Sequence, residues 1–132
     1  MYRIYKPAIK PAHCPLEDVE QITFVNYLAK HYPHIRDLMT HVKNEGKRTK
    51  GQADKDKAMG MHKGVSDIII IARVPFVAEL KRNDPSKNSA TAQQKQYLLS
   101  AHNAGAFACL CYGHEALIQA FEDWRVNHDP SA

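Results

Sequence analysis

The sequence predicts an α/β domain in which helices and strands follow in the order α-β-β-β-α-β-α. Two short apolar runs, 67–72 and 76–81, are rich in β-branched residues and separated by Arg73-Val74-Pro75, so we expect an antiparallel hairpin. Segments with helical signals lie on both sides of it, at 15–31, 92–103 and 116–126. At 132 residues the chain fits one domain with a single core, 1–132.

The N-terminal part combines an irregular arm with an amphipathic helix. We expect the proline-containing residues 1–13 to be irregular, and a helix from Pro15 to His31. On a helical wheel Glu17 falls in the apolar sector, whereas Glu20 is expected to face solvent. An acid on the core side suits either a metal site or the first turn of the helix, and from the residues alone the second is simpler. The apolar sector comprises Ile22, Phe24, Val25, Leu28 and Ala29.

The next segment holds the whole formal charge excess of the protein. We expect a strand at 38–43, ended by Asn44-Glu45-Gly46, and then a basic connection, 47–63, with a short helix at 52–61. Six basic and two acidic residues give 47–63 a balance of +4, equal to that of the chain. Such a connection suits a polyanionic partner, although a solvated loop is the alternative. The candidate nucleic-acid contacts are Lys47, Arg48, Lys50, Lys57 and Lys63.

The hairpin brings three charges together. Glu79 and Lys81 leave their strand on one face, with Leu80 on the other, and a turn near Arg73-Val74 places Asp67 roughly opposite Leu80. Two neighbouring carboxylates suit a hard divalent cation such as Mg²⁺, which favours phosphodiester hydrolysis. The alternative is an ordinary ion pair on the wet face of a half-covered sheet. The hairpin alone leaves both interpretations open.

The C-terminal part alternates between helix and strand. Residues 83–89 have the composition of a loop, and Thr91 is a suitable N-cap for a helix at 92–103, with Gly105 just beyond its end. A strand at 106–112 and an amphipathic helix at 116–126 follow, and we expect a frayed tail at 128–132.

Several classes of protein are excluded. No segment approaches the roughly 20 apolar residues of a membrane span, and the N-terminus lacks the apolar core of a signal peptide. Three cysteines make a poor disulfide framework, so a cytoplasmic location is expected. The histidines and cysteines have no zinc-site spacing, and there is no glycine-rich phosphate loop.

The order of these motifs resembles the PD-(D/E)XK nuclease superfamily, in particular its VRR-NUC branch, over residues 15–120. The family usually has proline before the aspartate, where this chain has Ser66, which should alter the loop more than the site. The motifs are Glu17-x-x-x-Gln21, Asn44-Glu45-Gly46, Lys63-Gly64-Val65-Ser66-Asp67, Glu79-Leu80-Lys81 and Thr91-Ala92-Gln93-Gln94.

The resemblance implies a restriction-endonuclease-like core, a central mixed sheet flanked by helices, with one or two Mg²⁺ or Mn²⁺ ions. Asp67, Glu79 and the backbone carbonyl of Leu80 would be metal ligands. Lys81 would position the attacking water. Glu17 would complete the acidic cluster, with Glu20 as the alternative acid, and Gln94 would contact the water shell or the scissile phosphate.

The implied function is a structure-specific DNA endonuclease, similar to Holliday-junction resolvases and acting as a homodimer. One alternative is a nuclease for flaps, nicks or linear duplex that works with a helicase or another replication or repair partner. A second is a non-catalytic nucleic-acid-binding module whose acids are structural. The motifs leave open whether the substrate is DNA or RNA.

Overall fold

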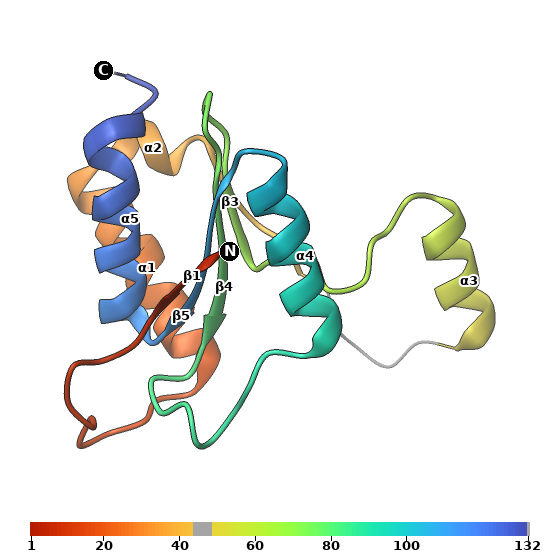
Figure 1. The fold of residues 1–132 in the computed structure, drawn as a ribbon, viewed down its shortest axis with the longest axis horizontal. Helices are drawn as coiled ribbons and strands as arrows, with labels where there is room; N and C mark the ends of the chain where they lie inside the picture. Colours follow the sequence, from red (N-terminus) through yellow and green to blue (C-terminus); the bar gives the residue numbers. More distant parts are fainter. Residues whose placement is uncertain (44–48, 132) are drawn as a thin grey trace.

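The computed structural model describes residues 1–43 and 49–131, which form one mixed sheet with helices on both faces (Figure 1). Five strands lie in the order β1-β5-β4-β3-β2. Their bounds are Arg3–Tyr5 (β1), Met39–His41 (β2), Ile68–Ile70 (β3), Phe76–Lys81 (β4) and Phe107–Tyr112 (β5). The expected α/β fold is confirmed.

The sheet combines an antiparallel half with a parallel half. Strands β2, β3 and β4 pair antiparallel, which confirms the hairpin, whereas β5 runs parallel to both β4 and β1. Within the arm expected to be irregular, Arg3–Tyr5 instead forms edge strand β1, paired with Cys109–Cys111. Three residues are too few for a sequence pattern, and the neighbouring strand supplies the hydrogen bonds.

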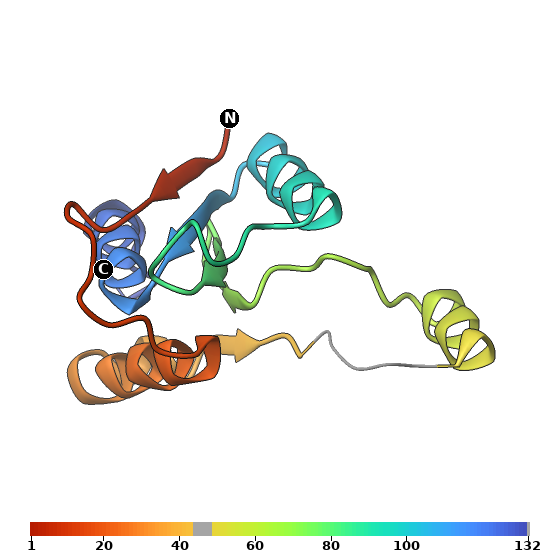
Figure 2. The same cartoon turned by 90° about the horizontal axis from the view of Figure 1, so that it is seen from below.

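Two layers of helix cover the sheet (Figures 1 and 2). On one face α1 (Glu17–His31), α2 (Pro33–Arg36) and α5 (His114–His128) surround the main core, where Phe24, Phe76 and Trp124 are fully buried. On the other face α4 (Ala92–Asn103) packs Leu98 against Val77 and Leu110. Helix α4 also makes the connection between the parallel strands β4 and β5.

Strand β4 carries the acidic motif between these layers, and all six of its residues are buried. Phe76, Ala78 and Leu80 join the core of α1 and α5. Since strand side chains alternate, Glu79 and Lys81 leave on the face that α4 covers. The interpretation as an ion pair on a wet, half-covered face is therefore wrong.

The hairpin register differs by one residue from the expected one. Ile68 pairs with Ala78 and Ile70 with Phe76, so the turn is centred on Arg73. Continued by one residue, this register places Asp67 opposite Glu79, not opposite Leu80 as expected. Side chains of directly opposite residues leave a sheet on the same face, so the two carboxylates are brought together.

Helix α1 is rotated relative to the expected orientation. Phe24 and Leu28 are fully buried as expected, but Ile22 is 58% exposed and Ala29 is also exposed. Glu20, expected to face solvent, is 1% exposed. The buried face follows the four-residue spacing of 20, 24 and 28, because the helix buries only a narrow stripe.

Helix α3 (Lys50–Ala58) stands away from the body of the domain (Figures 1 and 2). It buries no residue, and Thr49 caps it by accepting a hydrogen bond from the Gln52 amide at 3.1 Å. The expected turn Asn44-Glu45-Gly46 and the basic residues Lys47 and Arg48 lie outside the described residues. No helix within the described ranges has the length and apolarity needed to cross a membrane.

Candidate active site

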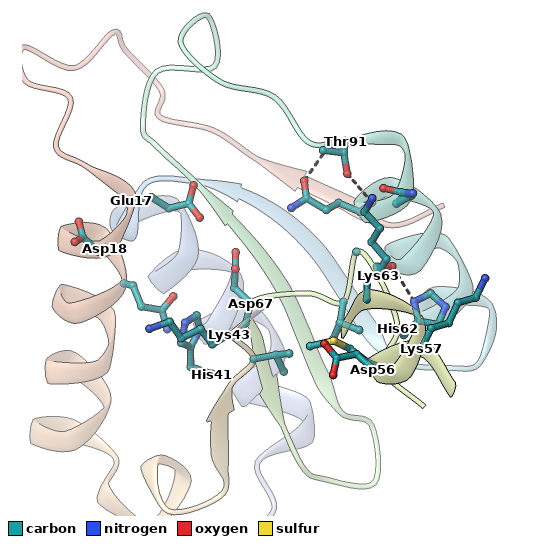
Figure 3. A pocket seen from close by; sticks show the side chains of 18 of the residues that line it. Glu17, Asp18, His41, Lys43, Asp56, Lys57, His62, Lys63, Asp67 and Thr91 are labelled. Carbon is teal, nitrogen blue, oxygen red and sulfur yellow. Dashed lines mark hydrogen bonds between the residues drawn. The ribbon is translucent and has the colours of Figure 1, made fainter. Parts of the chain in front are cut away.

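A cleft of about 1230 Å³ lies between the body of the domain and α3 (Figure 3). The start of α1, the end of β2, the start of α4 and residues from α3 to Asp67 line it. The side chains of Glu17 and Asp67 point toward the same part of this cleft (Figure 3). Asp67, expected to carry chemistry, is therefore at an accessible position.

Asp67, Glu79 and Lys81 meet where β3 and β4 separate. Asp67 Oδ2 accepts a hydrogen bond of 2.8 Å from the backbone N–H of Leu80. Lys81 Nζ lies 3.7 Å from Glu79 Oε1, with side chains 11% and 1% exposed. Among the described residues, neither carboxylate oxygen of Glu79 has a hydrogen-bond partner. A buried carboxylate without hydrogen bonds is costly unless positive charge or a proton neutralises it, and the Lys81 ammonium lies near Glu79 but beyond hydrogen-bond distance.

The protonation of these acids reflects burial and mutual repulsion. Burial, followed by the charge of Asp67, raises the pKa of Glu79 to about 8, although Lys81 opposes the shift. Burial also raises the pKa of Asp67, against the Leu80 hydrogen bond and the charge of Lys81. Perturbed pKa values of this kind are typical of functional sites, since both carboxylates gain from an added positive charge.

Glu17 is the first residue of α1 and lines the cleft. Burial raises its pKa, and the negative charge of Asp67 adds to the shift while Lys81 opposes it. Glu17 therefore lies within the electrostatic reach of the hairpin.

Glu20 has a different task, at the start of α5. Its Oε2 accepts a 2.6 Å hydrogen bond from the backbone N–H of His114, and its Oε1 lies 3.2 Å from His114 Nδ1. Gly113 has φ +91°, and a Cβ there would lie 2.7 Å from Glu20 Oε2. Glu20 thus stabilises the N-terminus of α5 across a space that only glycine leaves open. Its four-residue spacing from Phe24 and Leu28 is the sequence signal for this burial.

Gln94 lines the cleft at the start of α4, and its side chain is partly committed to helix capping. Its Oε1 accepts a hydrogen bond of 2.9 Å from the Thr91 amide, and Thr91 Oγ1 accepts one of 3.1 Å from the Gln94 amide. This capping box confirms Thr91 as the N-cap. The side-chain oxygen of Gln94 is thus engaged in the cap, and its side-chain NH₂ group, Nε2, is left to donate to a ligand in the cleft.

Gly64 fixes the path of the chain into Asp67. Its φ is +86°, and a Cβ there would lie 2.7 Å from both the carbonyl carbon and the carbonyl oxygen of Gln93. The segment before Asp67 therefore passes against the first turn of α4, which only glycine allows. Ser66, which stands where the VRR-NUC branch usually has proline, is fully buried.

Two of the lysines that line the cleft, Lys57 and Lys63, lie across it from Glu17 and Asp67, on the side where Asp56 also lines it (Figure 3). Lys57 and Lys63 line it, as does His62, whose ring centroid lies 5.6 Å from that of Tyr97. Lys50, also expected to bind nucleic acid, is exposed on α3 but does not line the cleft. Lys47 and Arg48 lie outside the described residues.

His41 is a cleft residue that the sequence did not indicate. It ends β2, and its Nδ1 lies 2.9 Å from the backbone oxygen of Asp67. A carbonyl oxygen can only accept, so Nδ1 carries the hydrogen and Nε2 is left for other partners. Its position depends on the pairing of β2 with β3, which no local motif encodes.

The donor atoms fit a hard divalent cation that retains water. Within residues 1–43 and 49–131, no three His, Cys, Asp or Glu side chains are grouped closely enough to hold a metal ion by themselves. Mg²⁺ commonly uses one or two carboxylates with waters and other oxygens. Asp67 and Glu79 would supply the carboxylates. The Leu80 carbonyl leaves the strand on the same side as its N–H, toward Asp67.

The fold and this acidic group together define a restriction-endonuclease-like α/β domain. No model of a protein family matches the chain, and no curated protein matches it in sequence. Among solved structures, it is similar to a VRR_NUC domain protein with a TM-score of 0.71 and 22% sequence identity. The match covers 86% of this chain and 91% of the other. This likeness confirms the VRR-NUC fold that the motifs indicated.

Proposed function

We propose that this chain is a metal-dependent nuclease that hydrolyses phosphodiester bonds in the cleft. The observation that carries the proposal is the buried carboxylate of Glu79, without hydrogen-bond partners among the described residues and beside Asp67. A divalent cation would neutralise this pair, and the lysines across the cleft would hold a polyanion next to it.

Each residue of the site has a role in this proposal. Asp67, Glu79 and the Leu80 carbonyl hold Mg²⁺ or Mn²⁺. When bound, the cation offsets negative charge that develops on the phosphate oxygens and makes water easier to deprotonate. Lys81, held beside Glu79, orients the attacking water or a phosphate oxygen. Glu17 adds negative charge at the cleft side, and the amide group of Gln94 donates to the water shell or phosphate.

The proposed substrate is branched DNA, cut by a homodimer whose two sites act on two strands. The support is the resemblance to junction-cutting nucleases and the symmetry that such a substrate requires. The cleft contacts would recognise backbone and shape, because they are lysines, an amide and acids rather than a recognition helix. A flap or linear-duplex nuclease with a helicase partner and an RNA-directed nuclease are the competing outcomes.

The deciding experiment is cleavage of a labelled four-way junction, a flap, a linear duplex and an RNA duplex in Mg²⁺ or Mn²⁺. Wild type is compared with Lys81→Ala, and Lys30→Ala, at the far end of α1, is the matched control. We expect metal-dependent cleavage, strongest on the junction, that is lost in Lys81→Ala and retained in Lys30→Ala. Sedimentation of an active monomer would overturn the dimer, and the substrate ranking decides among the nuclease classes.

A non-catalytic binding module makes the opposite prediction for the acids. If Asp67 and Glu79 are structural, Glu79→Gln should bind DNA more tightly than wild type at a pH above about 8, where the Glu79 carboxyl carries its charge, with no effect of divalent metal. In a nuclease, the same substitution abolishes both cleavage and the rise in melting temperature that Mn²⁺ causes. Calorimetric melting with and without Mn²⁺ therefore separates the two classes even before a substrate is known.

A further inference from the structure

Arg82 directly follows Lys81 and reaches from the end of β4 to the segment that leads into α1. Its Nε donates a 3.0 Å hydrogen bond to the Pro15 carbonyl, and its guanidinium also donates one of 2.7 Å to the Cys14 carbonyl. Two bonds from one planar guanidinium fix both the position and the orientation of these peptides. Asn83 adds a third bond, 2.8 Å to the His13 carbonyl.

The hydrogen bonds of Arg82 lie next to the start of α1. The N-cap residue is Leu16, which has no side chain able to cap, and Glu17 follows as the first helical residue. Most helices fix their first turn with a capping side chain of their own. Here the two carbonyls that Arg82 binds lie immediately before the N-cap, so Arg82 anchors the backbone from which the helix starts.

The hydrogen bonds of Arg82 therefore join the two segments that carry the acidic residues, the end of β4 and the start of α1. Lys81 and Glu79 lie on β4, one and three residues before Arg82, whereas Glu17 lies two residues after Pro15. The guanidinium spans 67 residues of sequence to hold these two segments together. The side chain of Glu17 then reaches the part of the cleft where Asp67 points (Figure 3).

We propose that Arg82 is a positioning residue of the nuclease site, which holds Glu17 in place beside Asp67 through the Cys14 and Pro15 carbonyls. This inference rests on the proposed function, because it assigns Glu17 to a cation-binding site. Arg82 does not itself line the cleft. Its effect on cation binding must therefore pass through the backbone that leads to Glu17.

Coulomb's law and positioning make opposite predictions for Arg82→Gln. Removal of a positive charge near a cation site should strengthen cation binding. Loss of the positioning contact should weaken it, as substitutions of residues that orient a metal ligand commonly do, by about tenfold or more. Arg82→Lys, which keeps the charge but lacks the planar fork, should also bind more weakly than wild type.

The test is a double-mutant cycle read by Mn²⁺ binding, measured by calorimetry and by electron paramagnetic resonance, without nucleic acid. We expect Arg82→Gln and Glu17→Gln each to weaken Mn²⁺ binding by about tenfold, and the double variant to bind no more weakly than Glu17→Gln alone. Arg125→Gln, which removes an arginine on α5 paired with Glu122, is the control for general destabilisation and should leave Mn²⁺ affinity unchanged.

Two failures are distinguishable. If wild type neither binds Mn²⁺ nor cuts any substrate, the proposed function falls and this inference falls with it. If wild type binds Mn²⁺ and cuts, but Arg82→Gln binds Mn²⁺ as well as or better than wild type, the nuclease stands and Arg82 has no positioning role. Additive losses in the double variant would also overturn it, since they would show that Arg82 acts independently of Glu17.

Discussion

Asp67 and Leu80 are joined by a hydrogen bond of 2.8 Å from the Leu80 amide to Asp67 Oδ2, at the point where β3 and β4 separate. One carboxylate thus both closes the end of the hairpin and faces the cleft. The bond holds Asp67 beside Glu79, whose own carboxylate oxygens have no hydrogen-bond partner among the described residues. Substitutions of Asp67 can therefore separate its structural role in the hairpin from its proposed role in cation binding.

Substitutions of Asp67 should distinguish its structural role from its chemical role. Asp67→Ala leaves the Leu80 amide without an acceptor and should lower the free energy of unfolding by about 1–3 kcal/mol. Asp67→Asn keeps an acceptor oxygen and should cost less, because it also removes repulsion with Glu79. Both should lose Mn²⁺ binding and cleavage. Urea denaturation and Mn²⁺ titration of the two variants measure these effects, and an Asp67→Asn protein that still binds Mn²⁺ would remove Asp67 from the ligand set.

The two acids of α1 should behave in opposite ways. Glu20→Ala removes the acceptor for the His114 amide inside the core and should destabilise the fold by about 1.5–3 kcal/mol, with Mn²⁺ affinity unchanged in the folded protein. Glu17→Ala should change stability by less than about 1 kcal/mol and weaken Mn²⁺ binding. Thermal melting and Mn²⁺ titration of both variants form one matched experiment. Weaker Mn²⁺ binding in Glu20→Ala alone would reverse the assignment.

The sequence predicts well those elements that depend on residues close together in the chain. The helix from Ala92 to Asn103 has its N-cap at Thr91 and ends before Gly105, as expected, because capping residues and glycine act within one turn. The hairpin and the shared face of Glu79 and Lys81 follow from the two-residue period of strands. The motif order was sufficient to indicate the VRR-NUC fold that the structural comparison confirms.

The parts that sequence misses depend on partners far along the chain. Strand β1 exists because β5 offers an edge about a hundred residues later. The roles of Glu20 and Arg82 depend on backbone atoms at 114 and at 14–15, which no periodicity reveals. The hairpin register was wrong by one residue because composition located the turn but not its centre. The contacts of β1, Glu20 and Arg82 lie between segments that are far apart in the sequence, so local patterns could not predict them.

Two glycines of the segment between α3 and β3 provide a test of close packing. Gly64 and Gly60 both have positive φ, but a Cβ at Gly64 would meet the Gln93 backbone at 2.7 Å, whereas nothing lies within 4 Å at Gly60. Gly60→Ala should therefore cost only backbone strain, about 1 kcal/mol, and Gly64→Ala distinctly more. Denaturation curves of the pair measure the difference. Equal costs would mean that the segment before Asp67 does not pack against α4 as described.

The stability of the far side of the domain should depend on pH through Glu122. Burial acts to raise the pKa of Glu122, but hydrogen bonds from Arg125 at 2.9 Å and Tyr27 at 2.8 Å outweigh it and hold this pKa below the ordinary value of 4.5. A lowered carboxyl pKa stabilises the fold fully above 4.5, and this contribution is lost as the pH falls through the lower folded value.

Wild type should therefore be more stable than Glu122→Gln at pH 6, and the difference should shrink as the pH is lowered from about 4.5 toward 3. Urea denaturation of the metal-free proteins at several pH values measures it. Arg125→Gln should show the same trend, because it removes the same charged contact. A stability difference that stays constant over this range would show that Glu122 contributes through packing and not through its charge.

The lysines of the cleft should set the salt dependence of DNA binding. Lys57 and Lys63 line the cleft across from Glu17 and Asp67, whereas Lys30 lies in the last turn of α1, about 20 Å along the helix from Glu17. If each cleft lysine neutralises one phosphate, Lys57→Gln and Lys63→Gln should each reduce the slope of log affinity against log salt by about one. Lys30→Gln should leave the slope unchanged. Fluorescence anisotropy with a labelled four-way junction in Ca²⁺ or without metal gives these slopes, and equal slopes for all four proteins would place the DNA outside this cleft.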